Sequence, residues 1–140
     1  MATYKTDTGT GTGTRSVYGW NAVIAYPLMP AAGQTVNGEP FNVPRAAKTL
    51  VIHLNPNSAG ATLSLQTLSP DVAADGTETW HTIKSLQLEA AADAYPALDS
   101  IPKQSAVVLY QAQFGNGVLR LVSAADESAA SFRIPCVFGF

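Results

Sequence analysis

Short runs that alternate between apolar and polar residues constrain the fold of this chain more than any other feature of its 140 residues. They are clearest between residues 48 and 84, where Pro, Asn, Asp and Gly separate one run from the next. The apolar residues of the first two runs stand at every second position: Leu50, Ile52, Leu54, Leu63 and Leu65. A period of two is typical of half-buried antiparallel strands. We therefore predict strands over 48–54 and 62–68, joined by a turn at Pro56, which has no N–H to donate to a ladder.

A hairpin is predicted around Gly117, which follows an asparagine. The apolar runs 106–114 and 118–123 flank this pair, and Asn-Gly is the favoured sequence of a two-residue type I′ turn. Centring the turn there places Phe114 opposite Leu119, so that apolar residues meet on one face and polar residues on the other. We expect a positive φ at Gly117, so a β-branched residue there would destabilise the domain.

The last predicted strand covers residues 131–138. The residues of one of its faces are apolar: Phe132, Ile134, Cys136 and Phe138. Pro135 removes a ladder donor, so we expect an edge strand or a bulge. The only cysteine, Cys136, is expected to be a small core residue. These runs predict an all-β fold, an antiparallel β-sandwich that is jelly-roll-like or Ig-like, over residues 31–140. A further short strand is expected near 22–26, in the segment before the sandwich.

Residues 1–30 are predicted to form an extended N-terminal arm. Its Thr-Gly repeat, residues 6–14, has no side chain large enough to form a core, and alone in water it should be flexible. The repeat is either a tail or an arm that becomes extended on a neighbouring subunit. The aromatic segment after it is either ordinary core or a set of interface anchors, because Trp and Tyr carry much of the energy at binding surfaces. The candidate partner-binding residues are Tyr4, Arg15, Tyr18, Trp20 and Tyr26.

The chain carries few charges. Charged residues make up 13%, the net charge is −2, and the basic residues are scattered singly, whereas nucleic-acid binding needs a dense basic patch. No apolar run approaches the length of a membrane-spanning helix. We therefore expect neither nucleic acid nor a membrane as a partner. The low charge fits either a β domain rich in Ala, Thr and Ser or a subunit that partners cover. We expect self-association as a closed homotrimer or homodimer.

Few residues suggest chemistry. His53, His81 and Cys136 lie far apart in the sequence and lack the spacing of metal ligands. The acidic stretch 71–78 lacks the ligand spacing of an EF-hand, and we interpret it as a solvated turn. Trp80 lies in an expected strand, where a single Trp is more often a core residue than a platform for a sugar. We therefore predict no catalytic residue, no metal, no cofactor and no enzymatic activity.

Several of these features occur together in one order. A proline-rich lead-in at 39–44 precedes the strands at 48–54 and 62–68, and the Asp-Gly-Thr-Glu-Thr-Trp sequence at 75–80 and the run 117–123 follow. In this order they resemble the small β-sandwich virion proteins of tailed bacteriophages, particularly head decoration or cement proteins. Such proteins sit across capsid-subunit junctions and grip them with extended termini.

The resemblance implies a structural role. It implies a protein that is made in the host cytoplasm, binds the major capsid protein on the capsid surface and stabilises the virion. It carries over no catalytic residue. The alternative is a carbohydrate-binding or adhesin-like module of a phage tail. Surface aromatics beside acids and amides would favour a sugar ligand, whereas a flat aromatic patch beside an extended arm would favour a protein partner.

Overall fold

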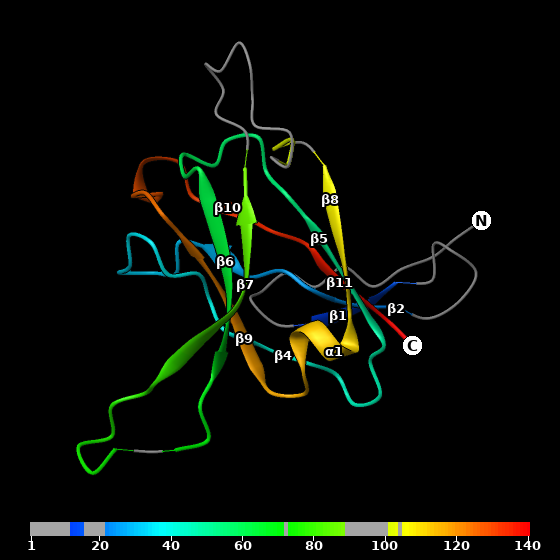
Figure 1. The fold of residues 1–140 in the computed structure, drawn as a ribbon. Helices are drawn as coiled ribbons and strands as arrows, with labels where there is room; N and C mark the ends of the chain where they lie inside the picture. The colour runs from blue at the N-terminus through cyan, green and yellow to red at the C-terminus, as the bar shows by residue number, and fades with distance from the viewer. Residues whose placement is uncertain (1–11, 16–21, 72, 89–100, 104) are drawn as a thin grey trace.

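The computed structural model describes residues 12–15, 22–71, 73–88, 101–103 and 105–140. These residues form eleven strands, one short α-helix and one short 3-10 helix. The strand pairs within the sheets are antiparallel. Figure 1 shows the two larger sheets packed as two layers. The predicted all-β, antiparallel sandwich is therefore confirmed.

The larger sheet has five strands in the order β1-β2-β11-β5-β8. Their bounds are Thr12–Arg15 for β1, Ala22–Ala25 for β2, Cys136–Gly139 for β11, Thr49–His53 for β5 and Ala106–Tyr110 for β8. The sheet therefore joins strands from both ends of the sequence, and β11 lies between β2 and β5.

The second sheet has four strands in the order β4-β9-β6-β7. Their bounds are Phe41–Asn42 for β4, Val118–Ser123 for β9, Thr62–Leu68 for β6 and Trp80–Gln87 for β7. The pairing of β6 with β7 shifts register between Leu65 and Gln66, which marks a β-bulge. In Figure 1 the β6–β7 hairpin extends well beyond the body of the sandwich.

Four short elements complete the described fold. β3 (Leu28–Met29) and β10 (Phe132–Arg133) form a two-stranded sheet. The helix α1 (Gln111–Phe114) follows β8 directly, and the 3-10 helix (Ser128–Ala130) precedes β10. Arg133 donates from Nη1 to the backbone oxygen of Tyr26 at 2.7 Å, which ties β10 to the end of β2.

The core lies between the two larger sheets and follows from the alternation in the sequence. Leu50 and Ile52 of β5 are fully buried, and so is Leu65 of β6. The Phe138 ring of β11 lies 6.2 Å from the Phe41 ring and 6.1 Å from the Phe114 ring, centroid to centroid. Alternate residues of β5, β6, β9 and β11 are therefore buried in one core, as predicted for the strands at 48–54 and 62–68.

A buried carboxylate fastens the loop that leads from one sheet to the other. Glu127 is 2% exposed, and it accepts hydrogen bonds from the N–H groups of Ala59 and Gly60, each at 2.9 Å. It also accepts from the hydroxyls of Ser58 at 3.1 Å and Ser123 at 2.8 Å. Because a buried charge needs such donors, Glu127 holds the connection between β5 and β6 in place.

The predicted hairpin around Gly117 is wrong. β8 pairs with β5 and β9 pairs with β6 and β4, so the two runs lie in different sheets. The chain turns through α1 instead, and Gly115 takes the left-handed conformation with φ of 71°. The φ of Gly117 lies outside that region. The helical turn buries Phe114 to 1% exposure, and this tertiary contact outweighs the local preference of Asn-Gly.

The expected boundary of the arm at residue 30 is also wrong. β2 is an inner strand of the five-stranded sheet, with Ala25 fully buried, and Met29 of β3 is 1% exposed. Residues 22–30 therefore belong to the sandwich, because their apolar side chains fill its core. β1 pairs along β2 within the same chain. The remainder of the predicted arm, residues 1–11 and 16–21, lies outside the described residues.

Pro135 does not mark an edge strand. The predicted strand over 131–138 is divided into β10 and β11, and Pro135 lies between them. Its carbonyl accepts a hydrogen bond from the N–H of His53 at 2.9 Å. Because the missing donor falls between two strands, β11 can occupy an inner position. Cys136 is fully buried, as expected, and burial raises the pKa of its thiol.

Candidate functional site

The predicted partner-binding residues do not meet within the described part of the chain. Tyr4, Tyr18 and Trp20 lie outside the described residues. Arg15 is the last residue of β1 and pairs with Ala22. Tyr26 is half-buried and follows β2. The arm contacts therefore stay predictions, and the described surface offers a different candidate.

An apolar stripe crosses the outer face of the five-stranded sheet. Cross-strand pairing places Val137 beside both Ile24 and Val51, and Val51 beside Val108. We call Ile24, Val137, Val51 and Val108 the apolar stripe. Ile24 is 4% exposed and Val108 is 51% exposed, and the two residues between them are half-buried. The stripe therefore becomes more exposed toward the edge strand β8.

The surroundings of the stripe carry little charge. Tyr110 pairs with Thr49 at one end of β8 and is 63% exposed. A groove of about 290 Å³ runs beside the stripe, and the described residues that line it include no Asp, Glu, Lys or Arg. Its lining residues are Ala22, Thr49, Val51, His53, Val137, Phe138 and Gly139. Surface patches that are apolar and depleted in charge are typical of protein-binding sites.

The outer face of the four-stranded sheet carries a network of polar side chains around Trp80. Arg120 Nε donates to Gln66 Oε1 at 2.9 Å, and the guanidinium carbon lies 4.3 Å from the centre of the Trp80 ring. Gln66 Nε2 donates to Thr82 Oγ1 at 3.2 Å, and Trp80 Nε1 donates to Glu78 Oε2 at 3.3 Å. Partial burial lowers the pKa of Arg120, and the charge of Glu78 opposes this shift. These side chains form a network, which we call the Trp80 cluster.

The expectation that Trp80 lies in the core is wrong. It pairs with Leu68 at the start of β7, where its side chain is half-buried on the outer face and contacts Arg120. The bulge between Leu65 and Gln66 lies between this end of β7 and the inward-facing Leu86. The alternation of the sequence places Trp80 on the outer face only when the unpaired residue of the bulge, Ile83, is counted. The sequence here has no clear signal of a bulge.

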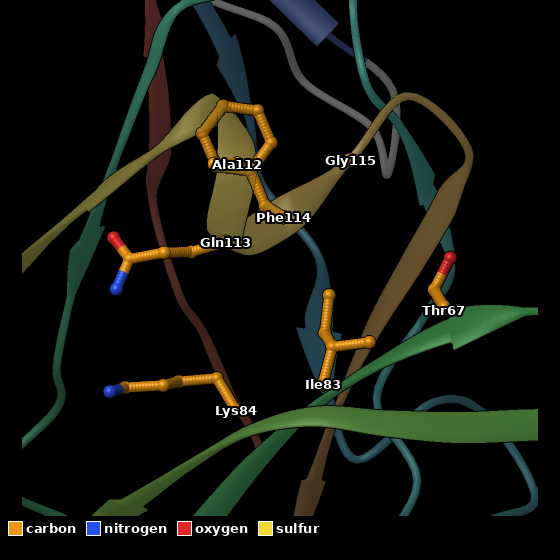
Figure 2. Close-up of a pocket in the computed structure, with 7 residues that line it drawn as sticks. All are labelled: Thr67, Ile83, Lys84, Ala112, Gln113, Phe114 and Gly115. Atoms are coloured by element: carbon orange, nitrogen blue, oxygen red, sulfur yellow. The ribbon is translucent and has the colours of Figure 1, made fainter.

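A hollow of about 540 Å³ separates β7 from α1, and Figure 2 shows the residues that line it. Ile83, at the bulge, and Thr67 lie on one side of it, while Lys84 and Gln113 lie together on the other. Gln113 Oε1 already accepts a hydrogen bond from the N–H of Tyr110 at 2.9 Å. Among the described residues that line the hollow, Lys84 is the one charged residue. A single ammonium group in an open hollow defines no reaction, so we assign the hollow no chemistry.

The acidic stretch turns at residues 73–76, as expected. Gly76 has φ of 79°, and Asp75 Oδ1 accepts a hydrogen bond from the N–H of Thr77 at 3.0 Å. Hydrogen bonds from the side chain and the backbone of Thr77 lower the pKa of Asp75. Within the described ranges, no three His, Cys, Asp or Glu residues are placed to hold a metal ion. The part of the chain that the structure describes also has no helix with the length and apolar character needed to cross a membrane.

Comparison with known proteins adds no identification. No family model matches the sequence, and neither a curated protein nor a solved structure matches it.

One feature of the sequence indicates the apolar stripe. The run from Ala106 to Tyr110 is apolar on both faces, although an antiparallel strand with one solvated face should alternate. Because an Asn-Gly sequence follows this run, the run was predicted to form one strand of a hairpin. Without that hairpin, two apolar faces on β8 indicate a surface that is covered by something other than the core.

Proposed function

We propose that this chain is a structural virion protein that binds the outside of a tailed-phage capsid across subunit junctions and stabilises the shell. Its partner is the major capsid protein, and it has no enzymatic role. The observation that carries the proposal is the apolar stripe, which lies beside a groove whose described lining residues include no Asp, Glu, Lys or Arg. The resemblance to decoration proteins supports the choice of partner.

The stripe suits a protein partner because it is rigid and apolar. Its residues are held by strand pairing on both sides at Val51 and Val137, so ordering them on binding costs little conformational entropy. Covering a fully exposed Val side chain stabilises a complex by about 1.5–3 kcal/mol at most. Tyr110, at 63% exposure, offers the kind of aromatic anchor that often dominates an interface.

We expect the complex to depend only weakly on salt. Tyr110 and the stripe contribute no charge, so burial of apolar surface dominates over electrostatic attraction. The measurement is binding to capsids that lack the protein, at low and at moderate salt. Affinity that collapses at moderate salt would contradict this surface.

The sharpest test compares one substitution on each outer face. Val51→Lys places an ammonium group in the stripe, where a partner would have to bury it, and it should weaken capsid binding at least about tenfold. Ser64→Lys makes a similar change on the half-buried outer face of the other sheet and should leave binding unchanged. Equal binding by both variants and the natural chain, with circular dichroism showing that each is folded, would rule out the stripe as the capsid-binding surface.

The predicted arm contacts are a separate part of the proposal. A chain that begins at Thr12 retains all eleven described strands and loses Tyr4. It should bind capsids more weakly if residues 1–11 grip a neighbouring subunit, because ordering them costs about 1–2 kcal/mol per residue that only partner contacts can offset. Unchanged affinity would reduce this segment to a tail.

The Trp80 cluster supports a second candidate, a carbohydrate-binding or adhesin-like tail module. Its Trp ring beside Gln66 and Glu78 has the aromatic, amide and acidic groups that sugars engage. The ring already has Arg120 over one face, which is why we rank this candidate lower. Retention of a glycan by the natural chain but not by Trp80→Ala, without capsid binding, would favour it.

A further inference from the structure

The edge strand β8 has main-chain groups that point away from the sheet. The hydrogen bonds between β8 and β5 show which groups these are. Gln111 N–H donates to the carbonyl of Lys48 at 2.9 Å, and Leu54 N–H donates to the carbonyl of Ser105 at 3.0 Å. In an antiparallel ladder such bonds recur at every second residue. The main-chain groups of Val107 and Leu109 therefore face β5. Those of Ala106, Val108 and Tyr110 point away from the sheet.

One of these outward groups is already occupied. The N–H of Tyr110 donates to Gln113 Oε1 at 2.9 Å. Within the described residues, no hydrogen bond involves the outward N–H of Ala106 or of Val108, and β5 is the one strand that pairs with β8. The free edge therefore runs from Ala106 to Tyr110, and the Gln113 side chain ends it.

The other long edge strand, β7, carries the features that prevent edge pairing. It has a bulge opposite Leu65 and Gln66, and both His81 and Lys84 lie on it. Bulges and charged side chains are common protections of an exposed edge. β8 has no charge and no proline, and its register with β5 is continuous over five residue pairs. An unprotected, apolar and regular edge is a site where another strand can add.

We propose that two copies of this chain associate through their β8 strands, antiparallel about a twofold axis at Val108. The two five-stranded sheets then become one continuous sheet. Val108 exchanges both main-chain bonds with its counterpart, and the N–H of Ala106 donates to the carbonyl of Tyr110 in the other copy. This inference is independent of the proposed capsid role.

The sequence of β8 is complementary to itself in this register. Val108 meets Val108 on the outer face, and the large Tyr110 lies opposite the small Ala106. On the inner face Val107 lies opposite Leu109. Because β8 has no charged residue, no like charges meet across the axis, whereas directly opposed like charges would be destabilising. A second copy is therefore the occupant that the edge fits, and the twofold axis makes the contact self-limiting.

The experiment uses the full chain and changes one edge at a time. Val108→Pro removes the outward donor without removing any bond to β5, and proline is tolerated at such edge positions. Ser85→Pro is the matched change on β7. Leu88 N–H donates to the carbonyl of Ala61 at 2.7 Å, which makes Ser85 an outward residue by the same two-residue repeat. We expect sedimentation velocity to show a dimer for the natural chain and for Ser85→Pro, and a monomer for Val108→Pro.

A second variant and a second readout keep the test decisive if Val108→Pro does not fold. Val108→Lys places two ammonium groups opposite each other at the axis, and at 51% exposure the side chain is accommodated in the monomer. It should sediment as a monomer. In the natural chain, amide exchange at Val108 should slow as concentration rises, whereas exchange at Val107 and Leu109 should be slow throughout.

Two results would overturn the inference. The first is a natural chain that sediments as a monomer at every concentration. The second is a dimer that survives Val108→Lys. If that surviving dimer is lost in Val51→Lys, the copies pack face to face instead, because Val51 lies one strand inside the edge.

Discussion

Val51 and Arg120 both project from the middle of a sheet onto its outer face, yet their surroundings are opposite. Val51 has Val108 and Val137 as its cross-strand neighbours, whereas Arg120 contacts Gln66 and Trp80 through a hydrogen bond and a ring contact. Both sheets supply equivalent leucines to the core. The residues of the inner faces thus specify the fold. The fold does not constrain the residues of the outer faces, so these residues indicate what the molecule contacts.

We expect the inner faces of the two sheets to contribute equally to the stability of the fold. Leu50→Ala in β5 and Leu65→Ala in β6 each remove a fully buried side chain, so each should lower the free energy of unfolding by about 2–5 kcal/mol. Chemical denaturation followed by circular dichroism measures both. A loss below about 1 kcal/mol for one leucine alone would mean that the two sheets do not share one core.

The connection that assigns β8 and β9 to different sheets depends on Gly115. Its φ of 71° is strained for other residues, although a Cβ there would meet no atom within 4 Å. Gly115→Val should therefore cost about 1–3 kcal/mol through the backbone alone, measured as a lower melting temperature and denaturation midpoint. Gly117→Ala is the control, since its φ is ordinary and its Cβ would lie 3.4 Å from Thr67 Oγ1. If Gly117→Ala lowered the melting temperature more than Gly115→Val does, that result would support the predicted hairpin around Gly117 instead.

The outer faces should differ in what they contribute to stability. Arg120→Met removes the ring contact and the hydrogen bond to Gln66, and we expect it to cost about 0.5–1.5 kcal/mol and to shift the Trp80 indole resonance. Val51→Thr on the apolar stripe should change stability by no more than about 0.5 kcal/mol. If Val51→Thr cost more than Arg120→Met in the isolated chain, the stripe would have a role in folding rather than in binding.

The smallest expected effect concerns the β6–β7 hairpin of the four-stranded sheet. Asp75 has a pKa below its ordinary value of 3.8 because it accepts hydrogen bonds from Thr77. A lowered folded-state pKa stabilises the fold above the ordinary value, and this contribution is lost as the pH falls through the lowered one. Asp75→Asn should therefore lose stability slightly less steeply than the natural chain as the pH falls below about 4. Thermal melts of both chains across this pH range measure the difference. If the melting temperatures fall identically with pH, the turn is equally stable with either side chain.

The sequence predicted those parts of the fold that depend on local patterns. The alternation through Leu50 and Leu63 located β5 and β6, and the apolar run around Cys136 identified a buried strand. The turn after Tyr110 could not be predicted in this way, because burial of Phe114 against Phe138 is a contact between residues far apart in the sequence. Local turn preference is worth less than burying a phenylalanine side chain.

The candidate site was harder to predict than the core. The aromatic residues at Tyr18 and Trp20 attracted attention because of their residue type, whereas the apolar stripe consists of ordinary valines. Only sheet order brings Val51, Val108 and Val137 together, since they come from three separate strands. Trp80 was misplaced for a related reason, because the bulge in β7 follows from pairing with β6 rather than from a sequence pattern.

The inner position of β11 has a consequence for how the protein is made on the ribosome. β11 joins β2 to β5, so a nascent chain that has not yet reached Cys136 carries two unconnected strand pairs with open inner edges. The sheet therefore closes only after the chain has been synthesised through β11, and such long-range pairing folds slowly, on the order of milliseconds to seconds. During that interval the growing chain is most vulnerable to aggregation. Messages truncated just before β11 should therefore yield insoluble product rather than a smaller sandwich.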